Sequence, residues 1–495
     1  MNDHLCKSAL NAAQALSQVS RAWDDDIVQR LEDYIRIPAK SPMFDADWVQ
    51  NGFIDSVVSN AASWIEAKKV AGLTLEIIRL PGRTPVLFFE VDASSGATAP
   101  DSAESDSGAT VLMYGHLDKQ PEFTGWRSDL GPWTPKYENG KLYGRGGADD
   151  GYAVYASIAA IEALKSQQVA HPRIVGLIET CEESGSYDLL PYLDALRTRL
   201  GQVALVICLD SGAGNYEQLW LTNSLRGLAS GVLKVEVLTE GVHSGDASGL
   251  APSSFRILRH LLDRLEDSVT GRLLPAEFHC QVPPDRLAQA QATAAILGAQ
   301  VIERFPWVQY EGAGGVVSVQ PTTTEPVQAL LSRTWAPALS VIGMQGMADI
   351  SNAGNVLRPF TAFKLSLRLP PLVDAAAVTA QLKTLLEANP PYRAHVTFES
   401  TGSANGWSAQ SMTPWFERSL EQASQAYFGA PCGFVGQGGS VPLIDMLAQG
   451  FPKAQMMVCG VCGPNSNAHG PNEFLHVPYA KKLTAAVAHV ISQVP

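Results

Sequence analysis

Four apolar runs in this chain lead directly into side chains that can bind a metal ion or carry a proton. The runs lie at residues 110–118, 174–183, 203–210 and 454–459, and their length and β-branched content suit buried strands of a parallel sheet. Six polar residues stand at or beyond their carboxyl ends, namely His116, Asp118, Glu182, Glu183, Asp210 and His469. Because open α/β sheets bind ligands just beyond the carboxyl ends of their strands, we expect these residues to meet in one crevice. Two histidines among four acids indicate a bound cation.

The domain organisation follows from the length and from a change of pattern. The 495 residues are too many for one hydrophobic core, so at least two domains are expected. Gly151–Lys165 and Pro191–Leu200 have helical patterns between the buried runs, which predicts βαβ units and a parallel sheet. From Leu228 onward, alternating strands and amphipathic helices predict an α+β sandwich. The fold class is therefore α/β, a catalytic domain with a mostly parallel mixed sheet flanked by helices, interrupted by a sandwich. The predicted borders are 1–223 and 404–495 for the catalytic domain and 224–403 for the insertion.

Other segments have clear local patterns. Residues 22–68 hold two helical patterns around Pro38 and Pro42. Asp92–Gly108 is small, polar and acidic, which is typical of a solvated loop between two strands. Further strands are expected at 74–79, 85–92, 228–238, 361–369 and 395–399. Further helices are expected at 252–268, 374–388 and 479–493.

The charge and the cysteine content limit the partners and the cellular compartment that we expect. The net charge of −13 argues against nucleic acid and anionic membranes as partners. The sequence shows no apolar segment long enough to span a bilayer and no secretory signal, so we expect a cytoplasmic protein. The seven cysteines are odd in number, which favours free thiols. Cys459 and Cys462 have CxxC spacing, but a zinc knuckle needs a second pair, so we interpret this spacing as incidental.

The charge balance of the expected crevice favours a hydrolytic metal centre. Zinc prefers histidine nitrogen and carboxylate oxygen, and paired zinc ions usually share a carboxylate and a water. Asp149 lies in a glycine-rich segment before a helix and is the candidate shared carboxylate. Two zinc ions supply +4 and the carboxylates of Asp149, Glu183 and Asp210 supply −3. The residual positive charge would acidify a bridging water to hydroxide, which is the nucleophile of a hydrolase.

Strand geometry assigns the remaining acids. Neighbouring residues of a strand point to opposite sides, whereas residues two apart share a side. In the Glu182-Glu183 pair, one carboxylate can therefore bind metal while the other faces the substrate as a general base. Asp118 shares a side with His116, so it can accept the imidazole N–H and orient the ring.

Seven strings in the chain are similar, in order, to motifs of the M20 metallopeptidase family, and most to its carnosinase-like dipeptidases. The strings are Gly115–Asp118, Gly144–Gly151, Glu182–Gly185, Asp210, Val242–Gly245, Gly438–Pro442 and Ala468–Glu473. The resemblance implies that His116, Asp149 and Asp210 bind one zinc ion. It implies that Asp149, Glu183 and His469 bind the other, with manganese or cobalt as alternatives. It also implies that Glu182 is the general base and that the Asp149–Asp150 peptide bond is cis.

The resemblance gives the inserted domain the role of a lid and dimerisation domain. His243 would reach the active site of the partner in a homodimer and stabilise the oxyanion. Gly439 and Ser440 would hold the carboxylate of a small peptide substrate, with Arg358 as the candidate arginine. The chain departs from the family pattern at Gly151-Tyr152, where many relatives have Lys-Gly, and at Gln437, where many have glutamate.

Three functions are consistent with these residues. The first is a dinuclear-zinc peptidase that hydrolyses the amide bond of dipeptides or small peptides. The second is an N-acyl-amino-acid deacylase or desuccinylase that uses the same metals with a different pocket. The third is a catalytically silent metal-binding or scaffold protein, which the full set of ligands plus base disfavours.

Overall fold

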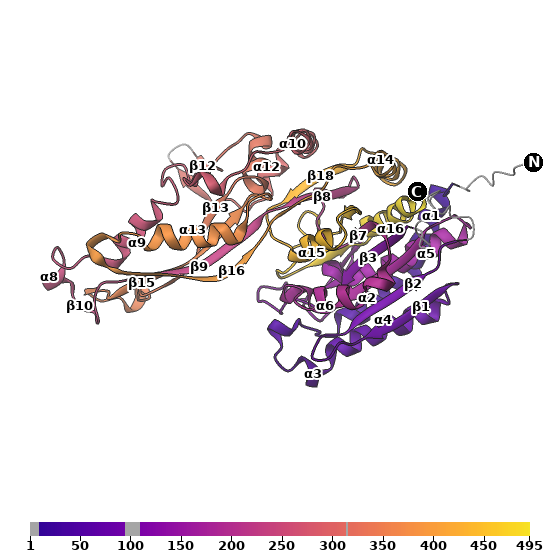
Figure 1. Cartoon of the computed structure of the whole chain (residues 1–495), viewed down its shortest axis with the longest axis horizontal. Coiled ribbons are helices and arrows are strands. Elements are labelled where there is room, and N and C mark those ends of the chain that lie inside the picture. The colour runs from indigo at the N-terminus through magenta and orange to yellow at the C-terminus, as the bar shows by residue number, and fades with distance from the viewer. Residues whose placement is uncertain (1–8, 95–108, 313–314) are drawn as a thin grey trace, which may run out of the picture. The chain divides into compact units, whose positions relative to one another are not determined.

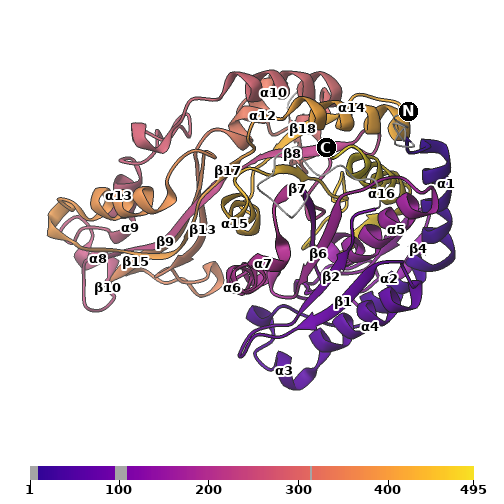
Figure 2. The ribbon, with the colours of Figure 1, turned by 45° about the vertical axis from the view of Figure 1, so that its right-hand side comes forward.

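The computed structural model describes residues 9–94, 109–312 and 315–495. The chain forms two compact units, which Figures 1 and 2 show as ribbons. The first unit comprises Met1–Thr222, Ala409–Val435 and Met446–Pro495, and the second comprises Asn223–Ser408 and Gly436–Asp445. The short segment Gly436–Asp445, which the sequence assigned to the catalytic domain, is thus grouped with the second unit.

The first unit is built on a mixed sheet with the strand order β1-β2-β6-β3-β7-β19. β6, β3, β7 and β19 are parallel, whereas β1 and β2 form an antiparallel pair at one edge. The strands are β1 (Leu73–Ile78), β2 (Val86–Val91), β6 (Arg173–Glu179), β3 (Thr110–His116), β7 (Val203–Cys208) and β19 (Gln455–Val458). The four apolar runs are therefore the four adjacent parallel strands, which confirms the predicted fold class. β3 is buried along its whole length, as its uninterrupted apolar sequence indicates.

Helices cover this sheet on its faces. α5 (Tyr152–Ser166) packs between β3 and α16 (Val477–Ser492), and nearly every residue of α5 is buried. α16 begins two residues before the predicted helix 479–493, with a proline in its first turn and the side chain of His476 accepting a hydrogen bond from Tyr479 N. The other main helices of this unit are α1 (Ala12–Ala22), α2 (Val28–Ile35), α4 (Phe53–Lys68), α6 (Leu189–Ala195), α7 (Arg197–Leu200) and α14 (Pro414–Phe428).

The second unit contains an antiparallel sheet in the order β13-β15-β9-β16. β9 alternates between buried and half-buried residues, which fits a sheet with one covered face. The helices α9 and α13 pack on this sheet, and Asp374 caps α13 by accepting hydrogen bonds from Ala376 N and Ala377 N. The elements are β13 (Ala338–Gln345), β15 (Phe360–Leu369), β9 (Gly227–Glu236), β16 (His395–Ala404), α9 (Ser254–Leu262) and α13 (Ala375–Glu387). This is the predicted α+β sandwich.

Some local predictions need correction. The helical pattern predicted at 191–200 forms two short helices, α6 and α7, separated at Leu196. The helix predicted at 252–268 ends at Leu262. The loop predicted at 92–108 lies mostly outside the described residues. The sequence did not predict α10 (Pro284–Leu297), α12 (Pro326–Thr334) or β13.

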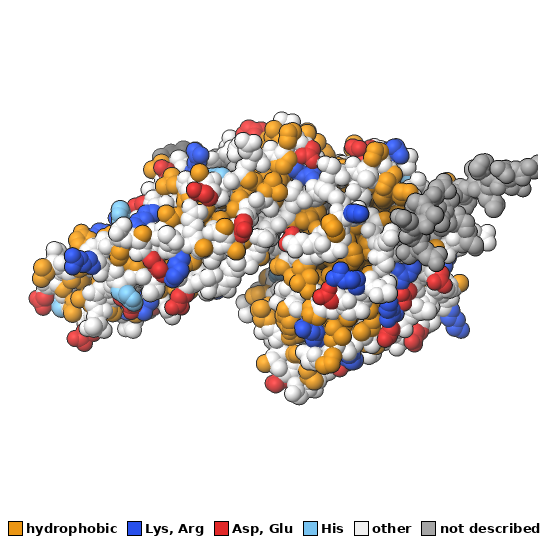
Figure 3. All heavy atoms as spheres, in the orientation of Figure 1, with side chains coloured by type: hydrophobic (Ala, Val, Ile, Leu, Met, Phe, Trp, Pro, Cys, Tyr) orange, Lys and Arg blue, Asp and Glu red, His pale blue; other side chains and the backbone are white. Residues whose placement is uncertain are grey.

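The surface charges, the helices and the cysteines add three observations. On the face drawn in Figure 3, acidic and basic side chains are interspersed. Within the described residues, no helix is both long enough and apolar enough to pass through a bilayer. Each cysteine in the described part of the chain is free, as predicted, including Cys459 and Cys462.

Candidate metal centre

The carboxyl ends of three adjacent parallel strands bring polar residues together. His116 is the last residue of β3, Asp210 follows β7, and Glu182 and Glu183 lie in a short 3₁₀ turn after β6. The His116 Nε2 atom lies 3.9 Å from Asp210 Oδ2 and 4.0 Å from Glu182 Oε2. Parallel pairing of β3 with both neighbours places these ends at one edge of the sheet, so the residues meet although they are far apart in sequence.

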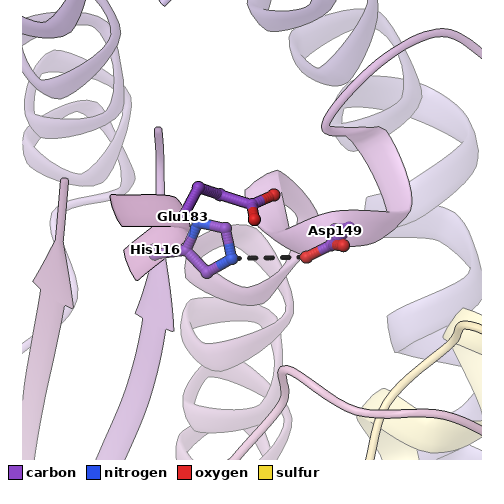
Figure 4. A group of neighbouring side chains, drawn as sticks. All are labelled: His116, Asp149 and Glu183. Carbon is purple, nitrogen blue, oxygen red and sulfur yellow. Dashed lines mark ion pairs between the residues drawn. The ribbon is translucent and has the colours of Figure 1, made fainter. Parts of the chain in front are cut away.

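Asp149 lies between the two histidines. Its Oδ1 atom is 3.3 Å from His116 Nε2, and its Oδ2 atom is 2.9 Å from His469 Nε2. The Asp149–Asp150 peptide bond is cis, as the resemblance implies. Figure 4 shows the side chains of His116, Asp149 and Glu183 pointing toward one another, and His469 Nε2 lies 3.3 Å from Glu183 Oε2. One carboxylate thus faces both imidazoles, which is the arrangement of a carboxylate shared by two cations.

The donor atoms fit divalent cations. The ligand atoms of His116, Asp149 and Glu183 lie within 4.8 Å of one another, and so do those of His116, Glu182 and Asp210. His116 Nε2 is buried without a hydrogen-bond partner in the described structure, which is costly unless another group binds it. Histidine nitrogen with carboxylate oxygen is the ligand set that zinc, manganese and cobalt accept.

Asp118 fixes the orientation of the His116 ring. The His116 Nδ1 atom lies 3.1 Å from the carbonyl oxygen of Asp118 and 3.3 Å from its Oδ1 atom. Both oxygen atoms of Asp118 are hydrogen-bond acceptors, so the neutral imidazole carries its proton on Nδ1. The lone pair of Nε2 is then available to a cation. The carboxylate of Asp118 also accepts hydrogen bonds from Glu182 N and Glu183 N, at 3.2 and 3.0 Å. One residue therefore positions the histidine and the paired glutamates together.

The acids of this cluster are too close to be charged together without cations. Burial and the charge of Asp210 raise the pKa of Glu182 well above its usual range, and burial and Asp149 do the same for Glu183. Burial and Asp149 raise the pKa of Asp210 to about 6. A bound divalent cation would remove the repulsion that causes these shifts.

The same cluster favours the charged form of an imidazole, whereas it favours the neutral form of most of the acids. Burial disfavours the charged form of His116, but the adjacent carboxylates of Asp118 and Asp149 outweigh burial and raise the pKa of the imidazole well above its usual value. Burial raises the pKa of Asp149, but the adjacent imidazoles of His116 and His469 outweigh burial and lower that pKa. The carboxylates of the cluster thus attract positive charge to the Nε2 atoms of His116 and His469.

A buried ion pair that the sequence did not predict supports the loop of His469. Arg145 pairs through Nη1 with Glu473, and both side chains are buried. Arg145 Nη2 donates hydrogen bonds to the carbonyl oxygens of His469 (3.0 Å) and Gly470 (2.9 Å). Glu473 Oε1 accepts a hydrogen bond from Gly146 N at 2.9 Å. The pair therefore links the segment that carries Asp149 to the loop that carries His469.

The predicted substrate-binding residues lie in the second unit. Ser440 donates a hydrogen bond to the carbonyl oxygen of Arg226 at 2.6 Å, and Gly439 has open space where a Cβ would stand. Arg358 donates from Nε to Gly346 O at 2.7 Å, so its guanidinium binds backbone. The arginine that the structure brings to Ser440 is Arg368, whose Nη1 lies 3.2 Å from Ser440 Oγ.

His243 lies in a small two-stranded sheet, next to the segment that carries Arg358. It belongs to β10 (Val242–His243), which pairs with β14 (Val356–Leu357). Its side chain is exposed, and its Nδ1 atom accepts a hydrogen bond from Gly245 N at 3.1 Å. The imidazole is therefore available to a ligand or to another subunit.

A mostly parallel sheet with a largely buried cluster of acids and His116 at its carboxyl edge, joined by the more exposed His469, is typical of a metal-dependent hydrolase. The family model described as "Peptidase family M20/M25/M40" matches residues 112–493, and the chain belongs to this family of peptidases.

Two relatives agree with this assignment, and two solved structures share the fold. A cysteinylglycine-S-conjugate dipeptidase of Corynebacterium striatum is 27% identical over 435 residues, which covers 85% of this chain and 88% of the relative. The human Beta-Ala-His dipeptidase is 26% identical over 450 residues, which covers 88% and 83%. The crystal structure of human carnosine dipeptidase 1 has a TM-score of 0.72 at 21% identity, and that of the dipeptidase Dug1p from Saccharomyces cerevisiae has 0.71 at 21%. Each covers 99% of this chain and 100% of the other, so the fold is shared throughout.

Proposed function

We propose that this protein hydrolyses dipeptides or small peptides with the help of two divalent cations, zinc in the first place. The observation that carries the proposal is the position of Asp149, whose two carboxylate oxygens face His116 Nε2 and His469 Nε2. Two curated relatives that span most of the chain are named as dipeptidases, which supports a dipeptide as substrate.

The ligand sets follow the family resemblance and the distances. His116, Asp149 and Asp210 would hold one cation. Asp149, Glu183 and His469 would hold the other, consistent with the short distances from His469 Nε2 to both carboxylates. When bound, the cations would supply the Lewis acidity that activates water and polarises the amide carbonyl.

Glu182 is the proposed general base. Its carboxylate lies at the cluster, 4.0 Å from His116 Nε2, and its backbone N–H is held by Asp118. It would take a proton from the attacking water while the water oxygen bonds to the amide carbon. It would then deliver that proton to the leaving nitrogen as the carbon–nitrogen bond breaks.

The second unit would bind the substrate. We propose that Gly439, Ser440 and Arg368 hold the carboxylate of the peptide, because the guanidinium of Arg368 contacts the Ser440 hydroxyl. The exposed His243 would stabilise the oxyanion across a homodimer interface. A cytoplasmic location remains a prediction.

A substrate panel on the metal-loaded protein tests the proposal. Dipeptides such as Cys-Gly and β-Ala-His should be hydrolysed, N-acetyl and N-succinyl amino acids should be poor substrates, and a chelator should abolish the activity. A clear preference for N-acyl amino acids would replace the dipeptidase with the deacylase. Absence of hydrolysis of either class by protein with stoichiometric metal would favour a catalytically silent protein.

A further inference from the structure

The second unit contains a cavity with several cationic side chains in its lining. The cavity measures about 760 Å³, which is within the range of small-molecule sites. Arg226, Arg272, Arg333 and His279 belong to its lining. We call it the arginine cavity. All of its lining residues belong to the second unit, whereas the residues proposed to bind metal belong to the first.

The cations of the arginine cavity have no countercharge. Its described lining includes no aspartate or glutamate, although acids outnumber bases in the chain by 49 to 36. In the described part of the chain, none of the three arginines forms an ion pair, and the guanidinium of Arg226 donates only to the carbonyl oxygens of Gly438 and Ala336. Burial and nearby arginines lower the pKa of Arg226 and of Arg333 to about 10. Gathering unpaired guanidinium groups in a partly buried cavity is unfavourable unless an anion enters.

The remaining wall is apolar and aromatic. Phe305 and Trp307 line the cavity, and their rings pack edge to face with centroids 6.0 Å apart. The guanidinium carbon of Arg333 lies 5.4 Å from the centroid of the Phe305 ring, so this aromatic wall adjoins a cation. Gln328 and Ser332 also belong to the lining, and Gln328 Nε2 donates a hydrogen bond to Ser332 Oγ at 3.2 Å. The lining therefore suits a molecule with one anionic end and one apolar end.

We propose that the arginine cavity binds a small organic anion whose carboxylate or phosphate group faces the three guanidinium groups and whose apolar part lies against Phe305 and Trp307. Arginine is suited to this role because its planar donors match both oxyanions in pairs of hydrogen bonds. The site goes beyond the proposed peptidase activity, and it does not require the metal centre.

Calorimetric titration of the metal-loaded full chain tests the proposal. Phenyl phosphate and phenylacetate are the two anionic probes, and benzyl alcohol is the neutral control. At least one anion should bind, and Arg333→Met and Arg272→Met should each weaken that binding about tenfold or more, since charge-assisted hydrogen bonds are lost. Arg272 is exposed, so its replacement should leave the fold intact. The phosphate and carboxylate arms show which oxyanion the cavity prefers.

Arg259→Met is the matched control, because Arg259 is an exposed arginine of the same unit outside the cavity and its loss changes the net charge equally. This variant should bind the anion like the unchanged protein. Any binding of phosphate to the metal centre would persist in all three variants and so would not mimic the expected result. Equal affinity in every variant, or failure of both anions to bind the unchanged protein, would overturn the proposal. Hydrolysis is not measured, so the outcome is independent of the proposed peptidase function.

Discussion

Arg145 and Glu473 form a buried ion pair that joins the glycine-rich segment of Asp149 to the loop of His469. The two residues are 328 positions apart in sequence. His469 has a positive φ of 66°, so its loop holds an uncommon backbone conformation next to the pair. The ion pair thus supports the geometry in which Asp149 faces both imidazoles.

We expect Arg145→Met to weaken the metal site that includes His469. Removing one partner leaves the charge of Glu473 buried and unpaired, which should cost about 3–5 kcal/mol of the free energy of unfolding. Elemental analysis after dialysis should show less bound zinc than in the unchanged protein, and urea denaturation should show the loss of stability. Arg127→Met is the control, because Arg127 pairs with exposed acids and its removal should leave the stability nearly unchanged. Full zinc content in Arg145→Met would contradict the positioning role.

Glu182→Gln should keep the fold and the bound metal but lose most of the hydrolysis. The amide is of similar size but cannot accept the proton of the attacking water, so kcat should fall by about 10²–10⁴-fold. Steady-state kinetics with a dipeptide, together with zinc analysis, provide the measurement. Glu66→Gln, at an exposed helical position, should leave kcat unchanged. A Glu182→Gln protein of normal activity would rule out Glu182 as the base.

Metal affinity should decrease at acidic pH. Burial and Asp149 raise the pKa of Asp210 to about 6, so this carboxyl group takes up a proton as the pH falls through that value. A cation must displace the proton, and affinity should fall about tenfold for each pH unit and each displaced proton below this pKa. Competition with a chelating dye at several pH values between neutral and mildly acidic would measure the metal affinity. An affinity independent of pH across this range would show that Asp210 does not bind the metal.

Arg368→Met should raise the KM for dipeptides more than it changes kcat. The loss of a charged contact to the substrate carboxylate should weaken binding by about tenfold or more. Arg358→Met distinguishes this assignment from the one made from sequence, because Arg358 donates to a backbone carbonyl oxygen. A larger increase in KM for Arg358→Met than for Arg368→Met would restore the sequence-based assignment. Arg259→Met is again the control, because it removes one positive charge at an exposed position of the same unit.

Local sequence patterns predicted the main architecture. Long apolar runs identified β3, β6, β7 and β19, and the rule for parallel sheets placed His116, Glu182, Glu183 and Asp210 at one edge. β13 was missed because most of its apolar residues, such as Val341 and Ile342, are exposed and give no alternating pattern. A strand whose stability comes from its pairing with β15 has no clear signature in its own residues.

The sequence by itself determined which side chains follow the buried strands, because burial imposes apolar periodicity and parallel strands end at a common edge. The tertiary structure alone decided that Arg145 pairs with Glu473, that Arg368 and not Arg358 contacts Ser440, and that three arginines line one cavity. These contacts join side chains from distant parts of the chain. Their geometry depends on how whole elements pack, and local periodicity carries no information about that packing.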